Sequence, residues 1–189
     1  MAAKGVRLSR PRLCIFCASS LGVRSVFAES ARQVAMLAVR RGWDIVYGGA
    51  HCGLMGLVAD TALAAGGAVY GAIPADMMDR ELAHSGLTEL AVVGSMHERK
   101  AQMERWSDAF LALPGGYGTY DELMEILTWA QLKIHSKPCG LLNVEGFYDP
   151  LLAQLDLAVA EGFLNPAYRN LLITETDPER LLLQLLQRR

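Results

Sequence analysis

The sequence of 189 residues has no long apolar run, and it lacks the apolar segment near the N-terminus that marks a signal peptide. A membrane-spanning helix needs about 18 or more consecutive apolar residues, and no run approaches that length. We therefore expect a cytoplasmic protein with no membrane partner. Repeats, linkers and low-complexity stretches are also missing. We expect one domain over 13–189, preceded by a flexible basic tail over 1–12.

An excess of positive charge is missing too, because 18 Lys and Arg residues stand against 20 Asp and Glu residues, giving a net charge of −2. This balance gives no general reason to expect nucleic acid as a partner. The cations of the tail could touch nucleic acid, but a solvated terminus explains them better.

The four cysteines are too scattered for a disulfide or metal framework. Cys14 and Cys17 fall in a predicted strand over 13–18, where their odd spacing sends the side chains to opposite faces. They cannot bind one zinc ion together. Cys139 is expected in the core of another strand, and Cys52, in a glycine loop, is the one accessible thiol. We predict no metal site.

The sequence does contain apolar segments typical of strands, which alternate with helical patterns at intervals of roughly 30 residues. This alternation predicts an α/β fold, a Rossmann-like, doubly wound parallel sheet with helices on both faces. Strands are expected at 13–18, 43–47, 68–73, 88–93, 109–113 and 137–144, with a short apolar segment at 171–174. Helices are expected at 26–41, 54–65, 96–106, from about 119 onward, at 149–161 and after Pro178, and 75–87 is expected to form a loop over the site.

The strand at 109–113 is followed by Pro114-Gly115-Gly116-Tyr117-Gly118, and a helix is expected to begin at about Thr119. Glycine lets the main chain approach a ligand closely, and the first N–H groups of a helix lack intrahelical acceptors. The order of strand, glycine loop and helix therefore predicts a phosphate site. Thr119-Tyr-Asp-Glu122 also fits a capping box, in which the acid merely caps the helix. This segment alone leaves both interpretations open.

The same order recurs after the strand at 43–47, where Gly48 and Gly49 precede a helix, and Ser19 lies in the turn after the first strand. Ligands of parallel sheets bind beyond the carboxyl ends of the strands. We therefore include Ser19, Gly48 and Gly49 among the candidate substrate contacts.

Arg99 falls on the apolar stripe of the helix over 96–106, which Ser95-Met-His-Glu98 opens as a capping box. An inward guanidinium needs an anion. That anion is either a structural carboxylate, such as that of Asp108 or Glu122, or a ligand. Lys100 could reach the same pocket, although a lone lysine is usually solvated. The helix that carries Glu122 is apolar on more than one flank, which favours a homodimer interface there.

Two long motifs resemble those of the LOG (Lonely Guy) family. Pro114-Gly-Gly-Tyr-Gly-Thr-Tyr-Asp-Glu122 matches its PGGxGTxxE motif, and Met96-His-Glu-Arg-Lys-Ala-Gln-Met103 looks like its Arg-Lys signature. The likeness extends over nearly the whole chain. It implies a Rossmann-like homodimer or larger oligomer that cleaves the N-glycosidic bond of nucleoside 5′-monophosphates, releasing free base and ribose 5-phosphate. The family prefers N6-prenylated adenine nucleotides (cytokinin ribotides), and many members also act on AMP.

The resemblance implies roles for single residues. Arg99 and Glu122 become the catalytic pair, without a metal or cofactor. Ala50 stands where many relatives have a third glycine, and Asp121 stands where a Glu is usual. Substrate contacts are implied for Glu81, Lys100, Gly115, Gly116, Tyr117, Gly118, Thr119, Tyr120, Asp121 and Thr128.

Two other functions stay open. A non-catalytic carrier of a nucleotide or phosphorylated cofactor needs the glycine loop but not the Arg99 and Glu122 pair. A lysine decarboxylase, a label often attached to relatives, needs a lysine for a Schiff base with pyridoxal phosphate. The chain has only Lys4, Lys100, Lys133 and Lys137, and none has a clear cofactor site around it.

Overall fold

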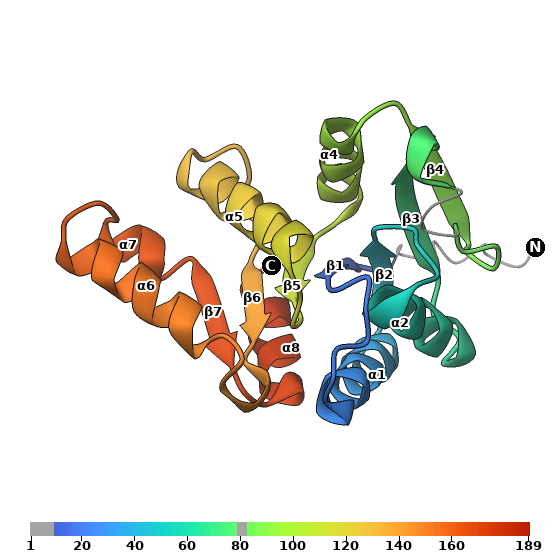
Figure 1. Ribbon diagram of the computed structural model, residues 1–189, viewed down its shortest axis with the longest axis horizontal. Helices are drawn as coiled ribbons and strands as arrows, with labels where there is room; N and C mark the ends of the chain where they lie inside the picture. The colour runs from blue at the N-terminus through green and yellow to red at the C-terminus, as the bar shows by residue number, and fades with distance from the viewer. Residues whose placement is uncertain (1–9, 79–82) are drawn as a thin grey trace, which may run out of the picture.

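A computed structural model describes residues 10–78 and 83–189, and its strands form one parallel sheet in the order β4-β3-β2-β1-β5-β6-β7 (Figure 1). The strands are β1 (Arg12–Phe16), β2 (Asp44–Tyr47), β3 (Val69–Pro74), β4 (Glu89–Val93), β5 (Ala109–Ala112), β6 (Cys139–Leu142) and β7 (Leu172–Glu175). The helices are α1 (Ser25–Arg40), α2 (Gly53–Ala64), α4 (Met96–Trp106), α5 (Tyr117–Gln131), α6 (Asp149–Ala160), α7 (Pro166–Arg169) and α8 (Pro178–Gln187).

The predicted fold class is confirmed, and every predicted strand and helix is present with ends shifted by a few residues. Helix α7 was not predicted, because four residues are too few to show a helical period. Its start has a local signal all the same. Asn165 accepts a hydrogen bond from the Ala167 N–H at 2.8 Å, and Pro166 follows the cap.

Helices cover both faces of the sheet. Val34 of α1, Ala62 of α2 and Leu181 of α8 belong to the core on one face, whereas Met103 of α4 and Ile126 of α5 belong to the core on the other. Figure 1 shows α4 and α5 on the opposite side of the sheet from α1 and α2. The cysteines follow this division, because Cys17 lies in the first core and Cys14 in the second. Their predicted separation is confirmed.

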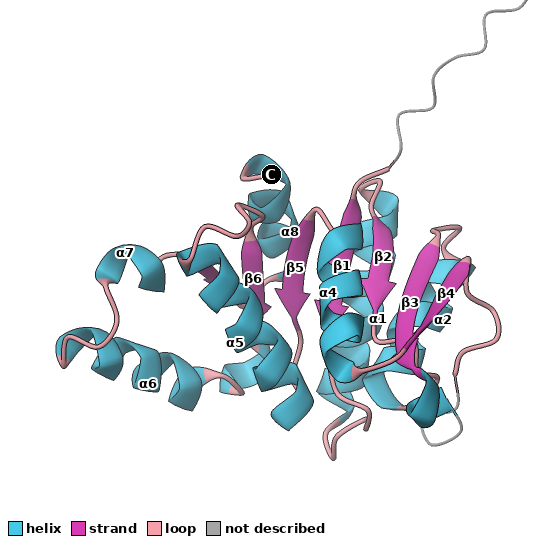
Figure 2. Ribbon diagram, turned by 90° about the horizontal axis from the view of Figure 1, so that it is seen from above, coloured by secondary structure: helices cyan, strands magenta, loops and turns pink. Residues whose placement is uncertain are grey.

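The sheet has its switch point at β1, which pairs with β2 on one side and with β5 on the other. The chain builds outward from β1 to β4 and then returns to β5, as Figure 2 shows from above. Loops that follow β1 and β5 therefore diverge, and the crevice between them is where parallel sheets bind ligands.

The predicted tail and the predicted loop are only partly described. Residues 1–9 and 79–82, which include Glu81, lie outside the described residues. Arg10 donates hydrogen bonds from Nη2 to the Val39 carbonyl at 2.6 Å and from Nε to the Gly42 carbonyl at 3.1 Å, and Arg12 begins β1. Within 75–87, η1 (Ala75–Met77) is a short 3-10 helix. No helix in the described ranges is long and apolar enough to cross a membrane.

Candidate active site

Helix α5 begins at Tyr117, two residues before the predicted start, and Gly116 is its N-cap. The capping-box interpretation of Thr119 and Glu122 is therefore wrong, since no side chain caps this helix. Thr119 lies in the first turn instead, packed so closely on Gly115 that a Cβ atom at position 115 would collide with its hydroxyl. Because glycines occupy both positions before the helix, the first backbone N–H groups of α5 are left uncovered.

The residues that carry these N–H groups lie at a cavity. The backbone N–H groups of Tyr117, Gly118 and Thr119 have no hydrogen-bond acceptor in the part of the chain that the structure describes. The first bonded one is that of Tyr120, 3.1 Å from the Gly116 carbonyl. Tyr117, Gly118 and Thr119 line a cavity of about 230 Å³. Unpaired donors at the positive end of a helix dipole make this cavity suitable for a phosphate.

The second glycine loop is used differently. The N–H of Leu54, at the start of α2, donates to the Ser20 carbonyl at 3.3 Å, and the N–H of Met55 donates to the Ala18 carbonyl at 3.3 Å. These bonds join the start of α2 to the loop after β1. The two glycine loops therefore have different roles. The start of α5 keeps unpaired N–H donors, whereas the start of α2 holds the loop after β1 in place.

Arg99 is the best-anchored side chain of the site. Its Nε donates to the Ala72 carbonyl at 3.1 Å, its Nη2 donates to the Gly48 carbonyl at 3.2 Å, and its Nη1 lies 3.3 Å from Oε1 of Glu122. A Cβ atom at position 48 would collide with the guanidinium, so a glycine is needed there. The inward direction of Arg99 and its expected carboxylate partner are both confirmed. The other candidate partner, Asp108, accepts a hydrogen bond from the N–H of Arg12 instead.

Arg99 and Glu122 are 6% and 7% exposed, and both line the cavity that the α5 N–H groups face. The guanidinium lies close enough to Glu122 to offset part of the cost of burying a carboxylate. The site therefore combines a carboxylate held by a guanidinium with a helix end that suits a phosphate. This combination suits a reaction that builds positive charge next to a phosphorylated sugar.

Cys17 also lines the cavity, but its thiol is a poor nucleophile there. Burial raises the pKa of Cys17, the carboxylate of Glu122 raises that pKa further, and the opposing effect of Arg99 is smaller. The thiol therefore stays protonated at neutral pH, and only a thiolate is strongly reactive.

The structure brings together eight of the predicted site residues as lining of this cavity: Ser19, Gly48, Arg99, Gly116, Tyr117, Gly118, Thr119 and Glu122. It does not bring the other described ones to the cavity wall: Gly49, Lys100, Gly115, Tyr120, Asp121 and Thr128. The implied substrate contacts of these six, and of Glu81, stay predictions.

Sequence reasoning missed Ile15, Cys17, Ala18, Ser20 and Met55, which also line the cavity. Cys17, Ala18 and Ser20 flank Ser19 directly after β1, so the argument that named Ser19 could have found them. Met55 enters from the first turn of α2, and only the packing of α2 against the loop after β1 reveals it.

A larger cavity, of about 740 Å³, lies elsewhere in the described chain. It includes Cys139, at the amino end of β6, and none of the predicted substrate contacts lines it. Chemistry is a better guide than size here, because the smaller cavity holds the paired charges and the free N–H groups.

Lys100 is held by two acids of α5. Its Nζ lies 2.9 Å from Oδ2 of Asp121 and 3.1 Å from Oε1 of Glu125. Burial by itself lowers the pKa of Lys100, but the hydrogen bonds to Asp121 and Glu125 outweigh it and raise that pKa. The charged Lys100 side chain thus links α4 to α5 through ion pairs.

We expect Lys100→Met to lower stability by roughly 1–3 kcal/mol, because the mostly buried Glu125 carboxylate loses its cation. The melting temperature measured by scanning calorimetry should fall by several degrees. Lys133→Met, at an exposed lysine, is the matched control. A raised KM without a change in melting temperature would instead support the direct substrate contact that the resemblance implies.

The chain is similar to several known proteins. A protein-family model described as "Possible lysine decarboxylase" matches residues 55–185. The chain is 48% identical over 182 residues to the cytokinin riboside 5'-monophosphate phosphoribohydrolase LOG of Oryza sativa subsp. japonica. The match covers 96% of this chain and 75% of that protein. It is 47% identical over 176 residues to the cytokinin riboside 5'-monophosphate phosphoribohydrolase LOG2 of Arabidopsis thaliana, covering 93% of this chain and 82% of that protein.

Two solved structures have the same fold at low sequence identity. The molybdenum cofactor binding protein from Rippkaea orientalis matches with a TM-score of 0.70 and 22% identity, over 95% of this chain and 97% of that one. The Moco carrier protein from Chlamydomonas reinhardtii matches with a TM-score of 0.70 and 19% identity, over 95% and 97% of the two chains. At such identities the likeness shows the fold alone.

Proposed function

Because the chain belongs to the LOG family of cytokinin riboside 5'-monophosphate phosphoribohydrolases, we propose that it hydrolyses the N-glycosidic bond of adenine nucleoside 5′-monophosphates, including N6-modified ones. The products are the free base and ribose 5-phosphate. The observation that carries the proposal is the buried pair of Arg99 and Glu122 in the same cavity as the free N–H groups of α5.

The first step is binding of the 5′-phosphate. The N–H groups of Tyr117, Gly118 and Thr119 donate to its oxygens, and the helix dipole favours its charge. The sugar of the bound nucleotide then lies within the cavity beside Arg99 and Glu122. Fixing the phosphate in this way places C1′ near the carboxylate without further ordering of the chain.

The chemical step is cleavage of the bond between C1′ and the base nitrogen. Positive charge develops on the ribose as the base leaves, so a fixed carboxylate is worth most in the transition state. Glu122 supplies that carboxylate and directs the attacking water, by analogy with the carboxylates of glycoside hydrolases. Arg99 is held by the Ala72 and Gly48 carbonyls, and it keeps Glu122 ionised and oriented. The proposed steps use no metal or cofactor.

The test is incubation of the purified protein with AMP and with isopentenyl-AMP, followed by chromatography of the products. Release of free base and ribose 5-phosphate in equal amounts is expected. The preferred base is read from the ratio of the two kcat/KM values. Binding of both nucleotides without release of base would refute the proposal in favour of a carrier.

The carrier alternative has the fold of the molybdenum cofactor binding proteins in its favour. A carrier needs only the phosphate-binding loop, so the carrier alternative does not explain why Arg99 and Glu122 are buried as a pair. The decarboxylase alternative is weaker. A Schiff-base lysine reacts as the neutral amine, but Lys100 is paired with two acids, and Lys137 is paired with Glu104.

A homodimer in the cytoplasm is part of the proposal. Apolar side chains near the ends of α5 and α6 are exposed, among them Leu132, Ile134 and Phe163, which suits a contact with a second copy. Thr128 lies about 9 Å along α5 from Glu122, at 1.5 Å per residue, so its implied substrate contact fits a site in the partner copy. Light scattering of the purified protein measures this oligomeric state.

A further inference from the structure

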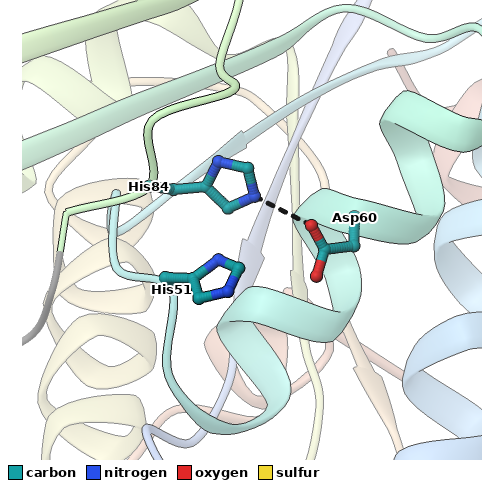
Figure 3. Close-up of side chains that lie close together, drawn as sticks. All are labelled: His51, Asp60 and His84. Atoms are coloured by element: carbon teal, nitrogen blue, oxygen red, sulfur yellow. Dashed lines mark hydrogen bonds and ion pairs between the residues drawn. The ribbon is translucent and has the colours of Figure 1, made fainter.

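Outside the active-site cavity, three side chains with metal-ligating atoms come together on the α2 side of the molecule. His51 lies in the loop between β2 and α2, Asp60 lies on α2, and His84 lies in the segment before β4 (Figure 3). One ligand atom from each residue can be chosen so that all three lie within 4.8 Å of one another. None of the three lines the cavity that holds Arg99 and Glu122.

The backbone sets this arrangement. Ala50 and Ala83 form an isolated antiparallel bridge, and the N–H of His84 donates to the Gly49 carbonyl at 3.0 Å. Two segments far apart in the sequence therefore run side by side, and each presents a histidine to the exposed Asp60. The prediction of no metal site considered the cysteines and missed this juxtaposition, which only the fold creates.

The side chains are already arranged around a common point. Nε2 of His84 lies 3.0 Å from Oδ1 of Asp60, and the rings of His51 and His84 meet edge to face with centroids 4.8 Å apart. Figure 3 shows both rings on the side of Asp60 that carries its carboxylate. The hydrogen bond to Asp60 accounts for the position of His84, but His51 forms no hydrogen bond within the described chain. Its ring nitrogens therefore stay available to a ligand, while the ring itself packs edge to face on that of His84.

We propose that His51, Asp60 and His84 bind one divalent transition-metal ion of the Zn²⁺ type, with water as the fourth ligand. Two imidazoles and a carboxylate are ligands that Zn²⁺ prefers, whereas Mg²⁺ and Ca²⁺ prefer all-oxygen sites. Ligand atoms on a tetrahedral Zn²⁺ lie about 3.3 Å apart, given bonds of about 2.0–2.1 Å. The His84 and Asp60 atoms are close to that separation, and the exposed His51 has to approach by a rotation of its side chain.

Binding changes one hydrogen bond. Nδ1 of His84 accepts from the Gly86 N–H at 3.0 Å, so the ring carries its proton on Nε2 and donates it to Asp60. Coordination through Nε2 moves the proton to Nδ1, and the Gly86 N–H must find another acceptor. Gly86 is exposed, so water can serve. Gly49, bonded to the N–H of His84, is the neighbour of Gly48, and the metal would therefore hold the loop that supports Arg99.

The test uses the untagged full-length protein and Co²⁺, whose visible absorption reports tetrahedral coordination. We expect one Co²⁺ per chain with tetrahedral bands, displacement by Zn²⁺, and no displacement by Mg²⁺. His51→Ala should weaken Co²⁺ binding at least about tenfold, because even changes to residues around the ligands cost roughly 10- to 100-fold in affinity. His97→Ala, at an exposed histidine on α4, is the matched control and should bind as the wild type does.

The melting temperature is a second readout, and it shows whether a variant loses metal binding because it unfolds. His51 is exposed, so His51→Ala should melt at the wild-type temperature without metal, whereas Zn²⁺ should raise the melting temperature of the wild type and of His97→Ala only. An octahedral spectrum for the wild type overturns the proposal. So does equal Co²⁺ affinity in the wild type and His51→Ala. Neither readout uses hydrolytic activity, so this result is independent of the proposed reaction.

Discussion

Glu122→Gln is expected to bind AMP with near wild-type affinity and to lose turnover by roughly 100- to 10,000-fold. The amide fills the same space beside Arg99, and its oxygen can still face the guanidinium, so the cavity keeps its shape. The amide carries no negative charge, so it does not stabilise the positive charge that develops on the ribose. Calorimetric titration with AMP gives the dissociation constant, and chromatography of released adenine gives kcat.

The matched control for this variant is Glu29→Gln, at an exposed glutamate of α1 far from the cavity lining. It makes the same chemical change and should leave kcat and affinity unaltered. Near-normal turnover of Glu122→Gln would refute the assignment of the catalytic carboxylate. Loss of AMP binding would also contradict it, because binding is assigned to the N–H groups of α5.

Arg99→Lys is expected to lower kcat by roughly 100-fold or more and to lower stability as well. The guanidinium reaches the Ala72 carbonyl, the Gly48 carbonyl and Glu122 from three different nitrogens. A lysine ammonium is a single point and cannot span all three. Each buried carbonyl that loses its donor costs about 1–3 kcal/mol, which corresponds to several degrees in melting temperature for a chain of this size.

The control for Arg99→Lys is Arg105→Lys, an exposed position on the same helix. Rates are compared at a temperature well below both melting transitions, so that partial unfolding does not lower kcat. Arg99 would lose its assigned role if Arg99→Lys kept full activity, whatever its stability. A fall in stability alone would leave it a structural residue.

The sequence was sufficient for the fold and for the direction of the two charged side chains. The alternation of strand and helix segments predicted the parallel sheet. The apolar stripe of the helix over 96–106 predicted that Arg99 points inward, and Glu122 was one of its two candidate carboxylate partners. The carbonyls that hold Arg99 could not be predicted from the sequence. Gly48 follows β2 and Ala72 lies in β3, and these strands come close to α4 only in the folded chain. The same holds for Lys100, whose partners Asp121 and Glu125 lie on the next helix.

The start of α5 shows how a local rule fails. Thr119 and Glu122 have the spacing of a capping box, but Gly116 is the N-cap, and Thr119 packs against Gly115 in the first turn. The cluster of His51, Asp60 and His84 had no local signal at all, because its members are separated in sequence and are joined by the bridge between Ala50 and Ala83.

The hydrogen bonds from the Leu54 and Met55 N–H groups to the Ser20 and Ala18 carbonyls have a thermodynamic consequence. The loop after β1, which forms one wall of the cavity, is ordered when the chain folds. Its conformational entropy is therefore already lost before any nucleotide arrives, and association does not incur that cost again. Weakening these bonds is therefore expected to lower the affinity for nucleotide.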